Sequence, residues 1–403
     1  MSGQKIQDMK NSVINTMGSI RNMNANIDAK LFTQTNMKGI IFLSMSIIFI
    51  IVGLIYYLLK TTSLSREMSY VNSLYPELNG LIKSVDNAPM FNYKGNDPED
   101  NKYDYTLRDF YIRTAYNCCS PGNYKNDYVN LDVLKTLLKQ GVRGLDFEIY
   151  SINDQPIVST STSDSYYVKE TYNYIYFADV MELIKNYAFS TSSAPNSRDP
   201  IILHLRIRSN NLEMYKNFAT LLKQYDSILL GKEYDSEYNG KNFGTVPLKN
   251  LLGKVSIILE KINTTYLECP EFYKFINMTS KSVFMKAIDY NSIASGTEQV
   301  NDLIEFNKQN MTICMPDSGE NPVNPYFYAL TNTGCQFIAM RYSMMDENLV
   351  LNNDFFNNIG YSFILKPLKL RYIPVTIPLP PPQNPELSFA TRTVESDFYK
   401  FDI

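Results

Sequence analysis

The segment Gly39–Leu59 contains no charged residue and is almost entirely apolar. At ~1.5 Å per residue, a helix of this length crosses a hydrocarbon core of ~30 Å. Tyr56 and Tyr57 suit the membrane interface, and Lys38 and Lys60 bracket the run. The alternative is a buried core helix, but such helices seldom run this long without a polar residue other than Ser. We therefore predict one transmembrane helix at 39–59, too far into the chain and without the cleavage site of a removable signal peptide.

The flanking segments divide the rest of the chain. Residues 1–38 are polar with a weak helical pattern, which predicts a mobile or weakly helical tail. Residues 60–104 predict a helical stalk and a linker, and residues 105–371 a globular region. Residues 372–403 form a C-terminal tail, in which Pro378–Pro382 suits a stiff linker or a docking segment for a partner protein.

Within the globular region, Gly141–Tyr150 marks a change from helical to strand periodicity. Leucines at helical spacing in Asn130–Gln140 predict a helix with Gly141 as its C-cap. After that glycine, Asp146 and Glu148 share one strand face and the apolar residues share the other. Taken alone, such a strand suits a half-exposed sheet with a solvated acidic face. In a parallel barrel, the same face would be the interior near the active-site end.

Strand-like and helix-like runs alternate through residues 105–371, which predicts a parallel sheet. The predicted strands are Phe110–Ala115, Gly144–Ile149, Ile157–Ser159, Pro200–Ile207, Lys254–Leu259, Met311–Met315, Phe337–Arg341 and Phe363–Leu365. A count near eight favours a TIM-type (β/α)8 barrel. The polar segment Lys232–Gly244 separates a first half, 105–231, from a second half, 245–371.

Composition excludes several classes of function. The net charge is −3 and no basic run occurs, so we expect no nucleic-acid partner. The single histidine, His204, excludes a mechanism that needs two histidines as acid and base. The five cysteines are odd in number and lack metal-ligand spacing, so we expect buried free thiols.

Five segments carry a resemblance to a known family. Gly141–Glu148 resembles a G-C-R-C-L-E-L-D strand, Pro156–Thr160 a P-V-I-Y-H strand, and Pro200–Arg206 a P-V-I-L-S-L-E strand. Gly334–Met340 resembles G-C-Q-M-V-A-L, and Asn358–Pro367 resembles N-G-x-C-G-Y-V-L-K-P. These are, in order, motifs of the two catalytic halves of eukaryotic phosphoinositide-specific phospholipase C. The resemblance covers roughly 105–371 and implies a TIM barrel of the phosphoric diester hydrolase type.

The resemblance also implies a catalytic site, from which this sequence departs. The family uses calcium and two histidines to cleave the phosphodiester. Tyr116 and Thr160 stand at the two histidine positions, and neither residue type shuttles a proton near neutral pH. The positions of the four calcium ligands fall on Asn117, Asp146, Glu148 and Arg206. Because Arg206 is a cation, we expect it to pair with a carboxylate instead of sharing the site with calcium.

His204 lies on the same predicted strand face as Arg206. A lone strand histidine is more often a hydrogen-bonded core residue than a catalytic one, but His204 and Glu148 are the candidates if the site has been rebuilt. The segment Ile313–Pro325, which resembles a shortened headgroup loop, lacks that loop's phosphate-binding arginines.

From these departures we expect a membrane-anchored, phospholipase C-like pseudoenzyme without a cofactor, which serves as a structural or binding module. Its expected partners are the membrane, a lipid headgroup and a protein that binds the Pro-rich tail. The alternative is an active phosphoric diester hydrolase with a rebuilt site, which would need calcium if the metal site still functions. The amino-acid composition, with 31 Tyr, 22 Phe and no Trp, is typical of coding by an AT-rich genome. Together with the resemblance to a eukaryotic family, it favours a large DNA virus as the source. The protein would then lie in a host or virion membrane.

Overall fold

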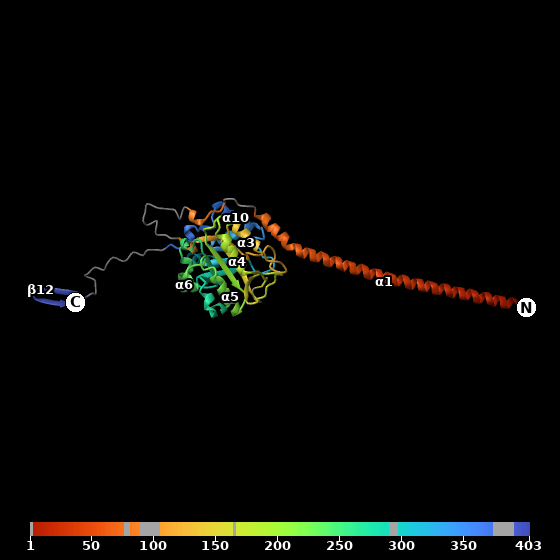
Figure 1. Ribbon diagram of the computed structural model, residues 1–403. Helices are drawn as coiled ribbons and strands as arrows, with labels where there is room; N and C mark the ends of the chain where they lie inside the picture. The colour runs from red at the N-terminus through yellow and green to blue at the C-terminus, as the bar shows by residue number, and fades with distance from the viewer. Residues whose placement is uncertain (1–2, 76–80, 89–104, 164–166, 290–296, 374–390) are drawn as a thin grey trace.

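The computed structural model describes residues 3–75, 81–88, 105–163, 167–289, 297–373 and 391–403. Helix α1 (Gly3–Leu74) projects from one side of an α/β barrel (Figure 1). A two-stranded hairpin of β12 (Thr393–Ser396) and β13 (Tyr399–Asp402) lies on the other side. The predicted docking segment Pro378–Pro382 lies outside the described residues.

Eight parallel strands form the barrel in the order β7-β6-β5-β2-β1-β10-β9-β8. They are β1 Phe110–Ala115, β2 Gly144–Ile152, β5 Ile201–Ile207, β6 Val255–Glu260, β7 Met278–Ser280, β8 Met285–Asp289, β9 Met311–Met315 and β10 Phe337–Met340. In the described part of the chain no ladder joins β7 to β8, so the ring is nearly closed. The predicted TIM-type architecture is confirmed. Below, the mouth is the end at which the parallel strands finish, and the base is the opposite end.

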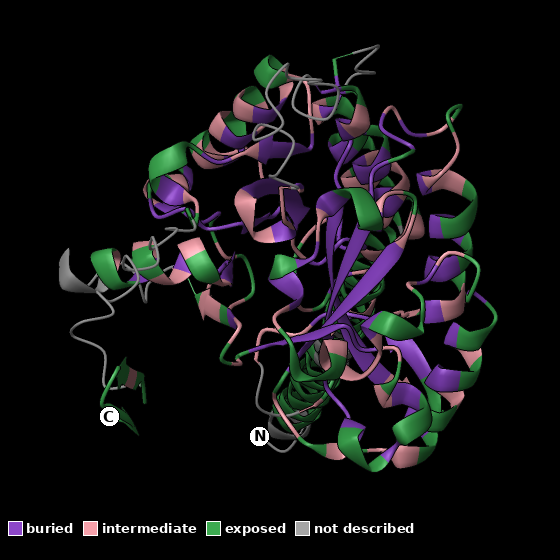
Figure 2. Cartoon of the chain, turned by 90° about the vertical axis from the view of Figure 1, so that its left-hand side faces the viewer, coloured by how far each residue is buried: buried purple, intermediate pink, exposed green. Residues whose placement is uncertain are grey.

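Helices surround the strands, whose residues are mostly buried (Figure 2). They are α3 Leu131–Lys139, α4 Phe177–Leu183, α5 Leu212–Lys223, α7 Pro270–Tyr273, α8 Thr297–Gln309, α9 Phe327–Asn332 and α10 Glu347–Ile359. Local sequence explains α3, because the Asn130 side chain accepts a hydrogen bond from the Asp132 amide at 2.8 Å at the start of the helix. Gly141, at φ +79°, makes the left-handed turn from α3 toward β2.

Two of the predicted barrel strands are wrong. The segment at Ile157–Ser159 forms β3 (Gln155–Val158), an antiparallel hairpin partner of β2. Phe363–Leu365 forms β11, which pairs antiparallel with β1. Their places in the ring are taken by β7 and β8. The count of eight was right, but strand direction depends on long-range pairing, which local β-propensity does not encode.

The inner face of the barrel changes character from base to mouth. Near the base it is apolar, with Ile112 and Ile202 in a buried cluster. Toward the mouth it becomes ionic, since Asp146 is 0% exposed and Glu148 1% exposed. The solvated acidic face expected from the strand alone is therefore wrong. The apolar residues that alternate with these carboxylates face the helices and belong to the larger core.

Helix α1 also differs from the prediction. The polar tail, the apolar run and the beginning of the predicted stalk form one continuous helix from Gly3. The stalk is no free spacer, because Val71 is fully buried and Tyr75 is 8% exposed in the barrel's main core. In the described part of the chain, one helix is long and apolar enough to cross a membrane, and its apolar run is exposed.

The segment Lys232–Gly244, predicted to connect the two halves, has structure of its own. It contains the 3-10 turn Lys232–Tyr234, the short α6 (Asp235–Gly240) and the start of a second turn, Phe243–Thr245. Tyr234 and Phe243 are buried in the cluster that includes the apolar residues near the base. The connection thus helps to close the barrel.

Candidate functional site

The centre of the mouth is occupied by the guanidinium of Arg206. Its Nη2 donates to Asp146 Oδ2 at 2.8 Å and to Asn117 Oδ1 at 2.7 Å. Its Nε donates to Asp146 Oδ1 at 3.0 Å, and its Nη1 to Glu148 Oε1 at 3.2 Å. The structure therefore brings together all four residues that the resemblance places at calcium-ligand positions. The Arg–carboxylate pairing expected from the sequence is present, and it involves both carboxylates.

Strand register explains why these side chains meet. In the parallel ladder of β2 and β5, Asp146 is paired with His204 and Glu148 with Arg206. Adjacent residues at the same level of two inward-facing strands project into the same space. Asn117 follows the end of β1 at a left-handed φ of 45°, and its backbone amide also donates to Asp146, at 3.2 Å. The left-handed turn places its side chain over the mouth.

The electrostatics keep Asp146 and Arg206 ionised. Burial opposes the charged form of Asp146, but the charge of Arg206 and the hydrogen bond from His204 outweigh it, so the pKa of Asp146 falls well below its usual range. Burial likewise disfavours the Arg206 cation, but Asp146 outweighs it and raises the pKa of Arg206. A fully buried guanidinium with these partners is a fixed internal counter-ion.

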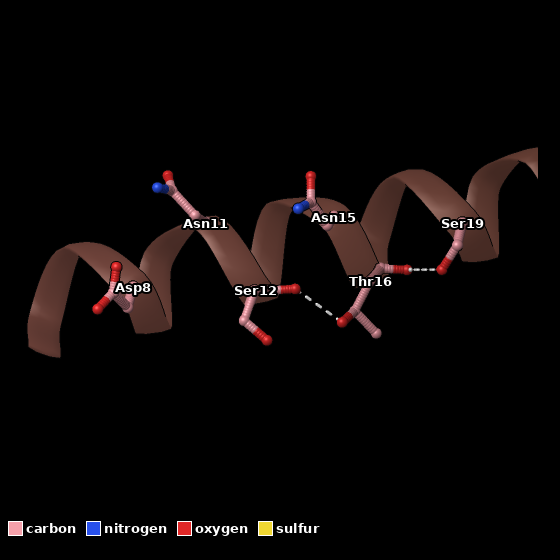
Figure 3. Close-up of a pocket in the computed structure, with 6 residues that line it drawn as sticks. All are labelled: Asp8, Asn11, Ser12, Asn15, Thr16 and Ser19. Atoms are coloured by element: carbon pink, nitrogen blue, oxygen red, sulfur yellow. Dashed lines mark hydrogen bonds between the residues drawn. The ribbon is translucent and has the colours of Figure 1, made fainter.

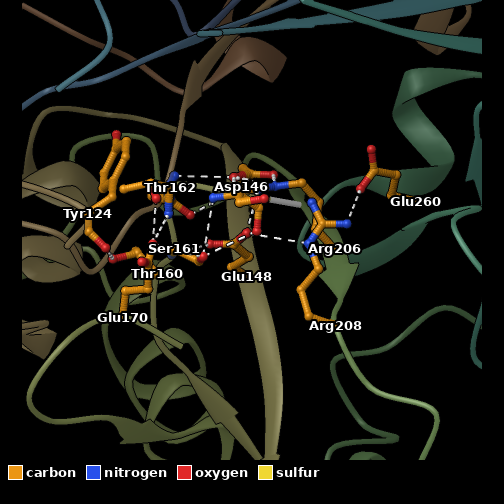
Figure 4. A network of polar contacts seen from close by, with 12 residues as sticks. Tyr124, Asp146, Glu148, Thr160, Ser161, Thr162, Glu170, Arg206, Arg208 and Glu260 are labelled. Carbon is orange, nitrogen blue, oxygen red and sulfur yellow. Dashed lines mark hydrogen bonds and ion pairs between the residues drawn. The ribbon is translucent and has the colours of Figure 1, made fainter. Parts of the chain in front are cut away.

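The ion pairs continue beyond Arg206 toward β6 (Figure 4). Arg208 donates to Glu148 Oε1 at 3.4 Å and to Glu260 Oε2 at 3.3 Å. Lys281, which is half-exposed, lies 2.8 Å from Glu260 Oε1. Three cations thus alternate with three carboxylates and leave the network neutral. Arg208, Glu260 and Lys281 were not predicted, although Arg208 lies two residues after Arg206 on the same strand face.

The two positions at which the resemblance implies histidines hold Tyr116 and Thr160, which do not fit acid–base roles. The ring of Tyr116 covers Arg206, whose Cζ lies 4.6 Å from the centroid of the tyrosine ring. Burial raises the pKa of Tyr116 well above its usual value, so it stays neutral. The hydroxyl of Thr160 donates to the Tyr124 carbonyl at 3.1 Å and is buried. Next to it, the Ser161 amide donates to Glu148 Oε2 at 3.1 Å (Figure 4).

His204 is hydrogen-bonded through both ring nitrogens. Nδ1 lies 2.7 Å from Asp146 Oδ1, and Nε2 lies 2.9 Å from Ser280 Oγ. The order Ser–His–Asp is that of a hydrolase triad. Here, however, Ser280 is fully buried and Asp146 is shared with Arg206. The chain of contacts therefore links β7, β5 and β2 without presenting a nucleophile to the surface.

Arg341, just beyond the end of β10, organises the shortened loop at the mouth. Its Nη1 donates to the Asn321 side chain and, at 3.3 Å, to the Pro322 carbonyl. Its Nη2 donates to the Gly122 carbonyl at 2.7 Å, and its Nε to Ser343 at 3.2 Å. All the contacts of this arginine described above hold loops together. It therefore does not replace the phosphate-binding arginines that the resemblance implies for this loop.

Calcium, which the resemblance implies, does not fit this donor set. The oxygens that would bind the ion accept hydrogen bonds from Arg206, and a guanidinium at their centre repels a cation. Among the described residues, no group of three or more His, Cys, Asp and Glu side chains is arranged to hold a metal.

Another hollow, on helix α1, does not make a site. It lies along one exposed helix face lined by Asp8, Asn11, Ser12, Asn15, Thr16 and Ser19 (Figure 3). Thr16 donates to the Ser12 carbonyl at 2.7 Å, and Ser19 to the Thr16 carbonyl at 2.9 Å. These are ordinary intrahelical contacts of Ser and Thr side chains.

The eight parallel strands define a TIM-type α/β barrel. Residues 103–261 match the family model described as "Phosphatidylinositol-specific phospholipase C, X domain". The first half of the barrel is therefore similar to the X domain of this family, as the sequence motifs predicted. No comparison bears on the predicted viral source, which stays a prediction.

Solved structures support the fold. The crystal structures of PLC21 from S. officinalis and from L. pealei each match with a TM-score of 0.51 and 17% sequence identity. Each match covers 66% of this chain and 38% of the other chain, so this protein corresponds to well under half of those proteins. No curated protein matches the chain in sequence.

Proposed function

We propose that this protein is a membrane-anchored, catalytically inactive phospholipase C-like protein whose barrel serves as a structural or binding module. The observation that carries the proposal is the position of Arg206. Its guanidinium is bonded to Asn117, Asp146 and Glu148, the three oxygen-bearing residues at the calcium-ligand positions. An internal cation supplies the neutralising charge there, so we propose that no calcium is bound.

The loss of acid–base groups supports the same conclusion. Positioned acid–base groups contribute ~10²–10⁴-fold each to a rate. Tyr116 and Thr160 stand where the two histidines would act, with a raised pKa at Tyr116 and a hydroxyl at Thr160 that is bonded to a backbone carbonyl. A bound metal would polarise the phosphate and lower the pKa of the attacking hydroxyl, and this contribution is missing as well.

Anchoring rests on the apolar run of α1. Gly39–Leu59 carries no charge, and its large side chains are exposed in the isolated chain. Burying this surface in lipid is strongly favourable, because no other described segment covers it. Deleting 39–59 should move the protein to the soluble fraction. Membrane association of the deletion variant that resists carbonate would refute the single anchor.

Catalysis is tested by inositol phosphate release from mixed micelles of phosphatidylinositol or its phosphorylated forms, with calcium present. We expect no release above background from the purified full-length protein. The alternative, an active hydrolase with a rebuilt site, makes a distinct prediction. Turnover that is abolished in His204→Ala would make His204 its catalytic residue, and turnover lost in Glu148→Gln alone would point to a carboxylate base.

We also propose that the barrel binds a lipid headgroup and that the Pro-rich tail binds a partner protein. The first follows from the membrane anchor and the X-domain family match. Vesicle binding by the deletion variant, compared between phosphatidylinositol and phosphatidylcholine vesicles, would test it.

A further inference from the structure

The part of α1 that follows the apolar run packs against the barrel instead of leading away from it. The side chain of Val71 is fully buried in the barrel's core, and Tyr75 OH donates to the Tyr342 carbonyl at 2.6 Å. Thr136 Oγ1 on α3 donates to Asn72 Oδ1 at 3.1 Å. The helix that would cross the membrane is therefore continuous with a helix that is an integral part of the barrel wall.

The direction in which α1 crosses the barrel can be read from its contacts. Lys60 Nζ lies 3.8 Å from the ring centroid of Tyr172, in a loop that lies against the segment following β1 at the mouth. Glu67 comes next and lies beside Asp127, in that same segment after β1, near Gly122. These first contacts of α1 are with loops at the mouth.

The contacts after α1 are at the opposite end. Ile82 packs against Gly141, which precedes β2, and the Val85 amide donates to Asp199 at 2.7 Å, two residues before β5. Both partners lie where parallel strands begin. Leaving the apolar run, the chain thus passes from the mouth along the side of the barrel to its base.

From this order of contacts we infer that α1 holds the mouth of the barrel against the surface of the membrane that the helix crosses. The inference rests on the proposed anchoring by Gly39–Leu59. A barrel attached the other way round would have its base loops next to Lys60. No spacer separates the two parts, because Lys60, which contacts Tyr172 of the barrel, directly follows Leu59.

The partner surface fits a phospholipid headgroup layer. A cleft of ≈ 240 Å³ joins the end of the apolar run to the mouth, and its lining includes Tyr56, Leu59 and Lys60 from α1 with Asn123, Asn126 and Tyr172 from the barrel. Tyrosine and lysine at the end of an apolar helix are typical of the membrane interface. The loops that contain Asn123 and Tyr172 would lie in the same headgroup layer. A lipid headgroup can therefore reach the mouth from the leaflet on which the barrel sits.

A fluorescent label can locate the mouth relative to the bilayer. All five native cysteines are buried, so a thiol-reactive NBD label can be directed to a new cysteine, with the wild type as the blank. Asn123→Cys places it on an exposed residue at the mouth, and Ser227→Cys on an exposed residue near the base, after α5. The full-length protein is reconstituted into phosphatidylcholine vesicles, with and without a lipid that carries a nitroxide on its headgroup.

We expect the nitroxide to quench most of the fluorescence at residue 123 and almost none at residue 227. Quenching at residue 227 alone, at both sites equally, or at neither site in protein that floats with the vesicles would overturn the orientation. Protein that does not float would refute the anchoring itself, and the orientation with it.

A matched pair of variants tests whether α1 sets the orientation. Val71→Arg disrupts the buried contact, whereas Tyr70→Arg changes a half-exposed neighbour on the same helix. With the label at residue 123, we expect Val71→Arg to lose most of the quenching and Tyr70→Arg to retain it. Equal quenching in the two variants would show that packing of α1 does not set the orientation, and if Val71→Arg fails to fold, the comparison of residues 123 and 227 still decides.

Discussion

The ring of Tyr116 covers the guanidinium of Arg206, and the Cζ of Arg206 lies 4.6 Å from the centroid of that ring. These residues stand at two positions where the family resemblance places a catalytic histidine and a calcium ligand. The two departures are thus physically connected. A buried arginine at a ligand position is stabilised by carboxylates on one side and by an aromatic ring on the other. A neutral tyrosine ring attracts the guanidinium, whereas a histidine that becomes protonated would repel it.

The first prediction concerns Arg206 alone. Arg206→Met leaves Asp146 and Glu148 buried near one another without the cation that bridges them, which should cost about 3–5 kcal/mol of stability. The measurement is urea denaturation of the full-length protein. Lys216→Met, which removes an exposed cation paired with Glu213, is the control and should change stability by about 0.5 kcal/mol or less. Equal, small effects of both substitutions would contradict a structural role for Arg206.

The second prediction concerns the coupling of Tyr116 to Arg206. Tyr116→Leu retains most of the apolar volume but removes the aromatic face, and should cost ~2 kcal/mol. In a double-mutant cycle with Arg206→Met, the two effects should deviate from additivity by roughly 1 kcal/mol or more. Strictly additive effects would mean that the contact contributes nothing. Tyr116→Phe should be close to neutral, because the face over the guanidinium is unchanged.

The third prediction concerns pH and the base of the barrel. Asp199 is fully buried, and it accepts hydrogen bonds from Val85 and Asn196. Burial raises its pKa to about 7, although Arg143 opposes the rise. The folded state therefore holds this proton more tightly than the unfolded state. Stability from this group is complete below pH ~4 and is lost as the pH rises through about 7, by on the order of 4 kcal/mol.

Asp199→Asn, which mimics the neutral acid, should flatten this dependence between pH 4 and 7. Asp132→Asn, at an exposed carboxylate on α3, is the control and should retain it. Thermal unfolding at several pH values is sufficient. A slope that is unchanged in Asp199→Asn would show that Asp199 is ionised in the folded protein throughout this range.

Much of the fold was predictable because it depends on local patterns and motif order. The alternation around Asp146 and the glycine at 141 predicted the α3–β2 unit, and the motifs predicted the barrel. β7 (Met278–Ser280) and β8 (Met285–Asp289) were missed, since they are short and β8 is not rich in β-branched residues. Pairing direction also escaped prediction, because β3 and β11 have strong strand sequences yet are antiparallel additions.

The site was predictable only where a motif fixed a position. Aligned motifs identified Asn117, Asp146, Glu148 and Arg206, and charge alone suggested the Arg–carboxylate pairs. Ser280, Glu260 and Lys281 come from a strand end and a turn with no recognisable motif, so nothing in the sequence linked them to the site. Likewise, the stalk pattern at Val71 predicted a helix, but only the folded barrel supplies the surface that buries it.

The most direct test of the central claim, that Arg206 stands in the place of calcium, is a calcium titration followed by thermal stability and calorimetry. The wild-type protein should give no stabilisation and no binding heat below about millimolar calcium, because a site with a cation among its ligands lacks the negative charge that sets affinity. Arg206→Glu restores a fourth oxygen ligand beside Asn117, Asp146 and Glu148 and should gain calcium-dependent stabilisation. Binding of micromolar calcium by the wild-type protein, lost in Glu148→Gln, would contradict the account.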